Sequence, residues 1–291
     1  MGMWVDTEKR LRRQAKVKKK LFSLLHKLGL TRFAAWWNRK RVVILCYHGV
    51  TARSQRHPSD HHGLHVRAAR FEAQLDYLRR YYKVISLADF LKARENTRSL
   101  PDYSVVLTFD DGYRNFLTAA LPRITARDMP VSVFLITDRI RSKDPRNLKE
   151  WSESDDETFL HWDEVKELQL KGVEFGSHTC SHAKLSELAT AEAERELRVS
   201  HKTIASHLSQ TRMPFAFPYG SYSDAVIAMT RTLAYTCALT TDAGINSCLT
   251  DPFMLRRNLI GDDDDEPLFA ARVSGLIAFL QRAAKSHKTL I

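Results

Sequence analysis

Short apolar runs alternate with stretches of helical periodicity from Val42 to the carboxyl end of the chain. A parallel α/β fold produces this alternation, because each strand is buried on both faces and helices connect the strands. The predicted strands are 42–47, 84–86, 104–109, 131–136, 173–176, 215–217, 235–239 and 254–260. The predicted helices are 67–82, 87–94, 113–127, 163–171, 190–208, 224–233 and 267–285, with a long loop at 141–158.

About seven to eight β/α units without a glycine-rich phosphate-binding fingerprint favour a distorted (β/α) barrel over a doubly wound sheet. The length of 291 residues fits one barrel domain. Hydrophobic residues make up 44% and charged residues 27%, which excludes a disordered protein. The four cysteines have no CxxC spacing, so we expect reduced and mostly buried thiols.

The positive charge of the chain is concentrated at its amino end. Of 45 basic and 34 acidic residues, 13 and 2 lie within residues 1–41, which leaves 32 of each in residues 42–291. We therefore predict an amino-terminal helical arm at 1–41 and a single catalytic domain at 42–291. A nucleic-acid-binding domain carries a basic face on its folded body, so the neutral body argues against nucleic acid as a partner.

Residues 17–41 mix lysines with leucines, Phe33, Trp36 and Trp37. This basic amphipathic pattern is typical of a helix that lies on an anionic bilayer surface. A solvated arm and a helix docked on the body or on a partner are the alternatives. His26, Lys27 and Gly29 interrupt the apolar stretch, so it is a poor secretory signal and we expect a cytoplasmic protein, peripheral on the inner membrane face.

Polar residues of catalytic types follow four of the predicted strands. His48 follows 42–47, Asp110 and Asp111 follow 104–109, His178 and His182 follow 173–176, and Tyr219 follows 215–217. The carboxyl ends of the strands meet at one face of a β/α barrel, where active sites are built. The sequence therefore predicts one shared site.

Two histidines four residues apart and one carboxylate, Asp111, form a set that can bind a metal ion and leave positions open for water and substrate. Zinc suits such a set for hydrolysis, and iron oxygenases use a related one. The neighbouring Asp110 can then take a proton from water. An incidental histidine pair and a solvated Asp-Asp-Gly turn are the alternatives.

Three motifs carry a family resemblance: Thr108-Phe109-Asp110-Asp111-Gly112, Ser177-His178-Thr179-Cys180-Ser181-His182 and Phe217-Pro218-Tyr219-Gly220. With the opening Cys46-Tyr47-His48-Gly49, they resemble the polysaccharide deacetylase family over about 42–260. The resemblance implies removal of N-acetyl groups from a glycan or lipid-linked glycan by a divalent-metal enzyme, with Zn²⁺ expected. It also implies that Asp110 is the general base, that Asp111, His178 and His182 bind metal, and that the Tyr219 backbone N–H stabilises the oxyanion.

The chain departs from the family pattern at two points. The carboxyl-terminal Leu-x-His motif is missing. The resemblance to members that open with Tyr-His implies that His48 is the general acid instead; a structural histidine at a strand end is the alternative. Ala216 stands where many members carry an arginine that orients the base. Arg257 on the last strand is our candidate for that role, and a surface or ion-pair arginine is the alternative.

Two other function classes fit the same residues. The missing motif residues would suit a catalytically silent glycan-binding barrel. A metal-dependent amidase with a non-sugar substrate would share the motifs, because pocket loops set specificity.

Overall fold

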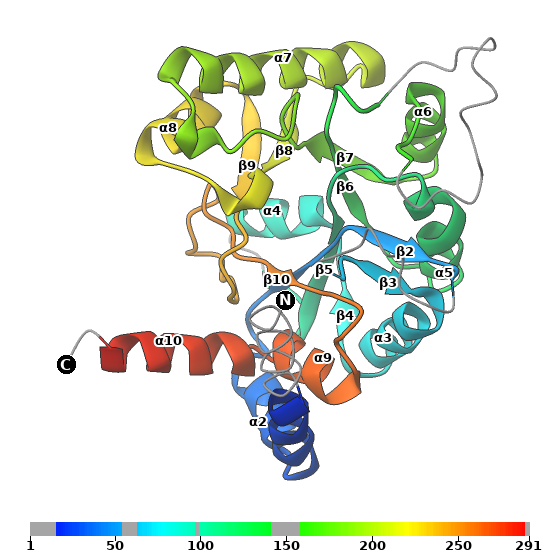
Figure 1. Cartoon of the computed structure of the whole chain (residues 1–291), viewed down its shortest axis with the longest axis vertical. Coiled ribbons are helices and arrows are strands. Elements are labelled where there is room, and N and C mark those ends of the chain that lie inside the picture. The colour runs from blue at the N-terminus through cyan, green and yellow to red at the C-terminus, as the bar shows by residue number, and fades with distance from the viewer. Residues whose placement is uncertain (1–15, 54–62, 97–98, 141–157, 289–291) are drawn as a thin grey trace, which may run out of the picture.

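The computed structural model describes residues 16–53, 63–96, 99–140 and 158–288. Its centre is a curled, parallel, eight-stranded sheet with the order β10-β1-β5-β6-β7-β8-β9, in which β4 pairs with β5 beside this path (Figure 1). The strands are β1 (Val43–Tyr47), β4 (Lys83–Val84), β5 (Ser104–Phe109), β6 (Ser132–Leu135), β7 (Glu174–Ser177), β8 (Met213–Ala216), β9 (Tyr235–Leu239) and β10 (Asn258–Leu259). The predicted distorted (β/α) barrel is confirmed.

The segment around β10 joins the two edges of this sheet. Leu255 bridges to Leu239 of β9, and three residues later Asn258 pairs with Leu45 of β1, both in parallel. A single strand had been predicted over 254–260, but only two residues form a regular strand because the segment changes partners along its length. This arrangement brings residue 257 into the barrel.

Most helices surround the outside of the curled sheet, and α4 (Leu87–Glu95) packs on its inner apolar cluster (Figure 1). The others are α3 (Ala68–Tyr81), a π-helical turn (Phe116–Ala120) running into α5 (Leu121–Thr125), α6 (Trp162–Leu170), α7 (Thr190–Leu208), α8 (Asp224–Thr232), α9 (Glu266–Val273) and α10 (Leu276–Lys288). Short 3₁₀ turns cover Leu185–Glu187 and Pro218–Gly220. The helical predictions are confirmed except that 267–285 is two helices, separated at Ser274 and Gly275.

Alternate residues of each strand enter different clusters, as the two-residue period of a strand requires. Leu45 and Leu107 pack outward in the large core beneath the helices, whereas Ile44 and Val106 pack inward with Phe90 of α4. Ile44 pairs with Val106 and Cys46 with Thr108. The inner face of β1 and β5 therefore changes from apolar at the amino end to polar at the carboxyl end.

A small second sheet was not predicted. β2 (Gly49–Thr51) pairs in parallel with β3 (His65–Arg67) just after β1. His65 belongs to β3, and its ring centroid lies 4.8 Å from that of Tyr113. Most of the predicted 141–158 loop lies outside the described residues.

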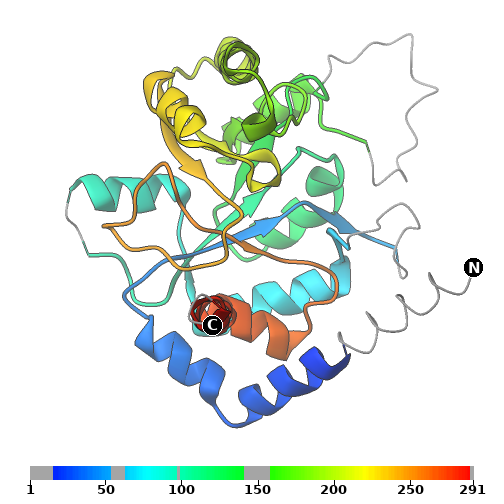
Figure 2. The ribbon, with the colours of Figure 1, turned by 60° about the vertical axis from the view of Figure 1, so that its left-hand side comes forward.

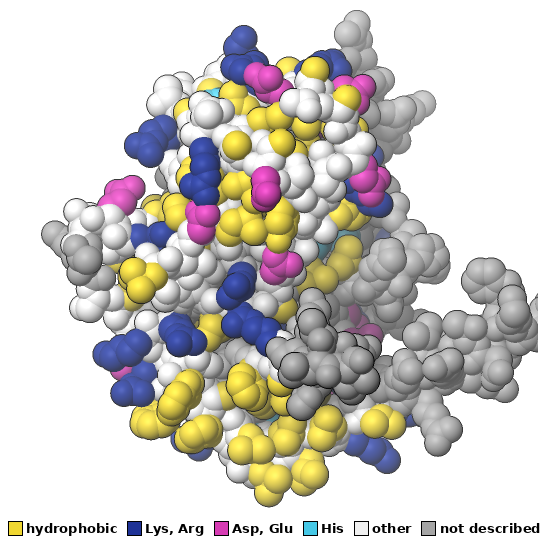
Figure 3. Space-filling view, turned by 90° about the vertical axis from the view of Figure 1, so that its left-hand side faces the viewer, with side chains coloured by type: hydrophobic (Ala, Val, Ile, Leu, Met, Phe, Trp, Pro, Cys, Tyr) yellow, Lys and Arg dark blue, Asp and Glu magenta, His cyan; other side chains and the backbone are white. Residues whose placement is uncertain are grey.

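The described part of the amino-terminal arm is a helix over 16–27 followed by α2 (Leu30–Trp37), with Gly29 in the left-handed conformation between them. Phe22 packs on Leu268, Ala271 and Ile277, so one face of the arm is docked on α9 and α10 (Figure 2). Other side chains of the arm stay exposed, and Figure 3 shows hydrophobic side chains gathered low on this face. The domain boundary between residues 41 and 42 stays a prediction.

Within the residues that the structure describes, no helix combines the length and the apolar character needed to cross a bilayer.

Candidate active site

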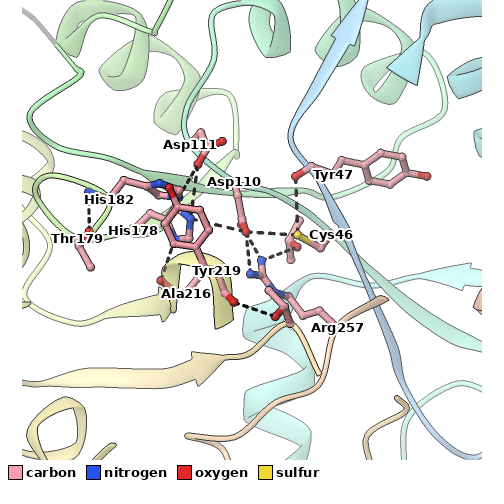
Figure 4. Close-up of polar contacts among 12 residues, drawn as sticks. Cys46, Tyr47, Asp110, Asp111, His178, Thr179, His182, Ala216, Tyr219 and Arg257 are labelled. Atoms are coloured by element: carbon pink, nitrogen blue, oxygen red, sulfur yellow. Dashed lines mark hydrogen bonds and ion pairs between the residues drawn. The ribbon is translucent and has the colours of Figure 1, made fainter. Parts of the chain in front are cut away.

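The predicted metal-ligand residues meet at the carboxyl ends of β5 and β7 (Figure 4). The Nε2 atoms of His178 and His182 lie 3.5 and 3.4 Å from Asp111 Oδ1, and the three ligand atoms are all within 4.8 Å of one another. Ligands about 2.1 Å from a tetrahedral zinc ion are separated by about 3.4 Å. The spacing therefore fits a divalent cation at the centre of this triad.

The surroundings of His178 prepare it as a ligand. Its Nδ1 lies 2.8 Å from the backbone carbonyl of Ala216, which can only accept a hydrogen bond. Nδ1 therefore carries the proton, and Nε2 offers its lone pair toward Asp111. Burial lowers the pKa of His178 to about 3, so the ring is neutral near pH 7. A neutral imidazole is the form that binds metal.

Asp111 has a carboxylate that a cation would satisfy. It is 5% exposed, and its Oδ1 is buried with no hydrogen-bond partner among the described residues. Burial, and then the charge of Asp110, raise the pKa of Asp111 to about 8. Because an ionised carboxylate is unfavourable there without a counter-charge, a bound cation would stabilise it.

Asp110 occupies the opposite electrostatic environment. Both of its oxygens accept hydrogen bonds from Arg257: Nη1 lies 2.6 Å from Oδ1 and Nη2 2.7 Å from Oδ2. Burial would raise the pKa of Asp110, but Arg257 and the neighbouring histidines lower it below its ordinary value. The two adjacent aspartates thus have opposite pKa shifts, and Asp110 is the ionised one.

Arg257 is itself fully buried and is fixed by further acceptors. Its Nε donates to the Thr240 carbonyl at 2.9 Å, and its Nη1 lies 3.4 Å from Thr108 Oγ1. The predicted contact between Arg257 and the candidate base is present in the structure, and a surface position for this arginine is excluded.

His48 lies beside Asp110, on the inner face that also carries Cys46. Ligand atoms of these three residues lie within 4.8 Å of one another. Burial lowers the pKa of His48 to about 4, and its Nδ1 has no hydrogen-bond partner among the described residues. This second cluster is a poorer cation site than the triad, because the guanidinium of Arg257 already occupies the carboxylate of Asp110.

Tyr219 closes the open side of the triad. Its ring lies 4.5 Å from the ring of His182 and is 61% exposed, and its backbone is in the left-handed conformation with φ 58°. Gly220 is required next to it, because a Cβ there would lie 2.0 Å from Thr241 Oγ1. The turn after β8 therefore holds Tyr219 beside His182 of the triad.

The profile of the family described as polysaccharide deacetylase matches residues 97–238. That range contains the metal triad, Asp110 and Tyr219. Residues 97–238 belong to the polysaccharide deacetylase family. The match begins after His48 and ends before Arg257, so geometry is what places those two residues in the candidate site.

Curated proteins named as N-deacetylases are similar to this chain. The poly-beta-1,6-N-acetyl-D-glucosamine N-deacetylase of Escherichia coli K12 is 25% identical over 240 residues. The match covers 72% of this chain but only 35% of the relative, so this chain spans about a third of that protein's length. The enzyme of the same name from Staphylococcus aureus MSSA476 is 24% identical over 213 residues, which cover 70% of each chain.

Two solved structures share the fold. Streptococcus pyogenes deacetylase PplD in complex with acetate superposes with a TM-score of 0.68 at 23% identity, covering 80% of this chain and 98% of that one. The structure of IcaB from Ammonifex degensii gives 0.65 at 23% identity, covering 81% and 97%. Their likeness supports the barrel fold.

Two contacts that support the candidate site were not predicted from the sequence. Cys46 Sγ lies 3.3 Å from Asp110 Oδ2 and can donate to it. Glu196 of α7 accepts hydrogen bonds from the backbone N–H groups of Cys180 and Ser181, at 2.9 and 3.0 Å, and so holds the loop that carries His182. The spacing of Cys46 two residues before His48 was the available signal, because both then share one strand face. No sequence signal connected Glu196 to the loop.

Proposed function

We propose that the chain is a metal-dependent N-deacetylase that hydrolyses the acetamide of N-acetylhexosamine units in a polysaccharide, oligosaccharide or lipid-linked glycan. One observation carries the proposal: a triad spaced for a divalent cation lies beside a carboxylate that Arg257 keeps ionised. The names of the Escherichia coli and Staphylococcus aureus relatives favour a β-1,6-linked N-acetylglucosamine polymer as the substrate class.

Asp111, His178 and His182 would hold the ion, which we propose to be Zn²⁺. When bound, it supplies a positive charge that polarises the amide carbonyl and makes water more acidic. Asp110 accepts a proton from water as the water oxygen attacks the acetyl carbon. Arg257 orients Asp110 through both carboxylate oxygens and keeps it deprotonated until that step.

The oxyanion needs a hydrogen-bond donor, and the departing amine needs a proton donor. The Tyr219 backbone N–H would donate to the oxyanion, which is the kind of preorganised donor that stabilises tetrahedral intermediates. His48 would deliver a proton to the amine nitrogen as the C–N bond breaks, which releases acetate and a free amine. With its pKa near 4, His48 is neutral at rest, so we propose that it first receives the proton that Asp110 takes from water.

The contact between Arg257 and Asp110 also helps to distinguish an enzyme from a catalytically silent glycan-binding protein. A silent glycan-binding barrel was favoured by the missing arginine at Ala216, but Arg257 makes a bidentate contact with Asp110 from another strand. A binding protein has no need for a buried arginine that keeps a carboxylate ionised next to a metal triad. The geometry therefore supports catalysis.

The test is metal content of the purified protein, paired with acetate release from β-1,6-linked N-acetylglucosamine oligomers with and without chelator. One metal ion per chain and chelator-sensitive release support the proposal. Bound metal without release from these oligomers, while a non-sugar acetamide is hydrolysed, would favour the amidase. No metal after reconstitution with Zn²⁺ would contradict the triad assignment.

We further propose that residues 17–41 make peripheral contact with a membrane, on the cytoplasmic face. The exposed leucines and tryptophans of the arm support this contact. Co-sedimentation with vesicles tests it: equal binding by the full chain and by a chain that begins at Arg41 would refute it.

A further inference from the structure

An apolar groove of about 560 Å³ runs between α2 and α10, apart from the active site. Its apolar wall is formed by Leu30, Phe33, Trp37, Ile245, Leu276 and Phe279. The groove lies toward the amino end of β1, because the arm residues that line it precede that strand. The catalytic side chains follow the carboxyl ends of the strands, so the groove and the active site share no residue.

The break between α9 and α10 creates this groove. Gly275 is in the left-handed conformation with φ 79°, and a Cβ there would lie 3.1 Å from both Asn38 Nδ2 and Ile245 Cγ2. Asn38 Nδ2 donates to the Ser274 carbonyl at 2.9 Å, which ties the end of α2 to the break. The direction of α10 is therefore fixed by packing and hydrogen bonding.

The rim of the groove exposes large aromatic side chains. Phe33 is 58% exposed, Trp37 67% and Phe279 66%, and Trp36 stands beside them with 48% exposed. Soluble surfaces seldom expose a contiguous aromatic patch without a binding function. Tryptophan is enriched where one side of a protein enters the headgroup region of a bilayer.

Positive charge borders the same groove. Arg41 and Arg282 are part of its lining, and Figure 3 shows Lys and Arg side chains gathered directly above the hydrophobic area. Burial, and then the charges of Arg256 and Arg41, lower the pKa of Arg282. An anion placed between these guanidinium groups would relieve their mutual repulsion.

We propose that this groove binds an anionic phospholipid of a bilayer surface, with an acyl chain between the α2 and α10 side chains and the phosphate at Arg41 and Arg282. The inference deepens the membrane contact of the proposed function and adds α10 to it. The lining combines apolar side chains with two guanidinium groups, so it offers contacts for both the acyl chain and the phosphate of a phospholipid. Because the catalytic residues lie at the other end of the strands, lipid in the groove leaves the active site open to glycan.

The experiment measures binding of the full chain to phosphatidylcholine vesicles with and without phosphatidylglycerol. The unmodified chain is expected to bind the anionic vesicles and to bind the neutral ones at least tenfold more weakly. Trp37→Ala with Phe279→Ala should weaken binding to anionic vesicles at least tenfold. Arg41→Gln with Arg282→Gln should weaken binding to anionic vesicles about tenfold and leave binding to neutral vesicles unchanged, because the other basic residues of the arm remain.

Matched control variants are available on α6 and α7, away from the groove. Leu170→Ala removes an apolar side chain that is 89% exposed on α6, and Arg198→Gln removes an exposed arginine on α7. Neither should change vesicle binding. Inorganic phosphate at millimolar concentration should not displace the vesicles, since it lacks an acyl chain; full displacement would overturn the lipid assignment in favour of a free-phosphate site.

Two further outcomes would overturn the proposal. One is unchanged vesicle binding by both groove variants. The other is self-association of the unmodified chain, lost in the Trp37→Ala/Phe279→Ala variant and unaccompanied by vesicle binding, which would make the groove an interface between copies. Hydrolysis of soluble oligomers is measured in parallel: a chain that binds vesicles but releases no acetate contradicts the proposed activity and leaves the groove assignment intact.

Discussion

The two ends of the barrel depart from the usual distribution of polar and apolar groups in opposite ways. At the carboxyl end of the strands, ionisable side chains are buried: Asp110, Asp111, His178 and Arg257 are each at most 5% exposed. At the amino end, the arm and α10 expose large aromatic side chains to solvent. The ligands that we propose would compensate for each departure: a cation and a glycan at one end, and a lipid surface at the other.

The largest expected effect is at the general base. Asp110→Asn keeps the shape of the side chain but removes the proton acceptor, and positioned general bases contribute roughly 10²–10⁴-fold. We expect acetate release to fall about 10³-fold, about 4 kcal/mol of transition-state stabilisation. Bound metal, measured in the same samples, should be unchanged because the triad is intact; undiminished turnover would contradict the assignment of the base.

The second largest effect is expected from substitution of Arg257, which should reduce both stability and activity. Arg257→Met leaves the charge of Asp110 buried without a partner, which costs about 3–5 kcal/mol. The double variant Asp110→Asn/Arg257→Met removes both charges and should recover most of that loss in urea unfolding, while remaining inactive. Equal destabilisation by the single Arg257→Met variant and the double variant would show that Asp110 and Arg257 are not energetically coupled.

The arginine also shows what the sequence could and could not predict. The strands and the strand-end positions of Asp110, Asp111, His178 and Tyr219 followed from apolar runs and from the parallel arrangement. The partner of Arg257 did not, because the contact spans 147 residues and depends on how the segment at 255–259 joins β9 to β1. The family motif even pointed to position 216, where this chain has alanine and uses only the backbone carbonyl.

Tertiary contacts also overrode local patterns elsewhere. The apolar periodicity of 267–285 continues through Ser274 and Gly275, so it predicted one helix. Packing of Gly275 against Asn38 and Ile245, far away in the sequence, selects the break. The π-helical turn at Phe116–Ala120 likewise sits inside a pattern that predicted a plain helix.

Metal and pH should act together at the triad. In the unfolded chain Asp111 ionises near pH 4, whereas in the metal-free fold its pKa is about 8. Between these values the fold binds the extra proton, so metal-free stability falls as pH rises through that window. A bound cation removes this loss. The stabilisation by Zn²⁺ should therefore grow from pH 6 to pH 8, by about 2 kcal/mol.

Thermal unfolding with chelator and with Zn²⁺ at each pH measures this growth. Asp111→Asn is the matched control, because its side chain stays neutral throughout. Its metal-free stability should lack the contribution that falls between pH 6 and pH 8. A Zn²⁺ stabilisation that is constant over this range would contradict the raised pKa of Asp111.

A smaller effect is expected at Cys46. Its thiol donates to Asp110 Oδ2, so Cys46→Ala removes one of the bonds that favour the ionised carboxylate. The acidic limb of the pH–rate profile should move to higher pH by up to about one unit, while kcat/KM near pH 7 should change little because Arg257 still keeps Asp110 ionised there. Cys46→Ser restores a hydrogen-bond donor, so its acidic limb should return to the position found in the unmodified chain. Equal pH–rate profiles for the alanine and serine variants would indicate a packing role only.

The smallest effect on hydrolysis tests whether the two ends are independent. Phe22 anchors the arm on Leu268, Ala271 and Ile277, so Phe22→Ala should release the arm and make it more susceptible to limited proteolysis. Leu24→Ala, on the same helix but 55% exposed, is the control that should leave the arm docked. Acetate release from soluble oligomers should stay within about twofold in both variants, because no catalytic side chain contacts the arm. A loss of hydrolysis that parallels arm release would instead show that docking at the amino end positions the residues at the carboxyl end, and the comparison between two separate ends would no longer hold.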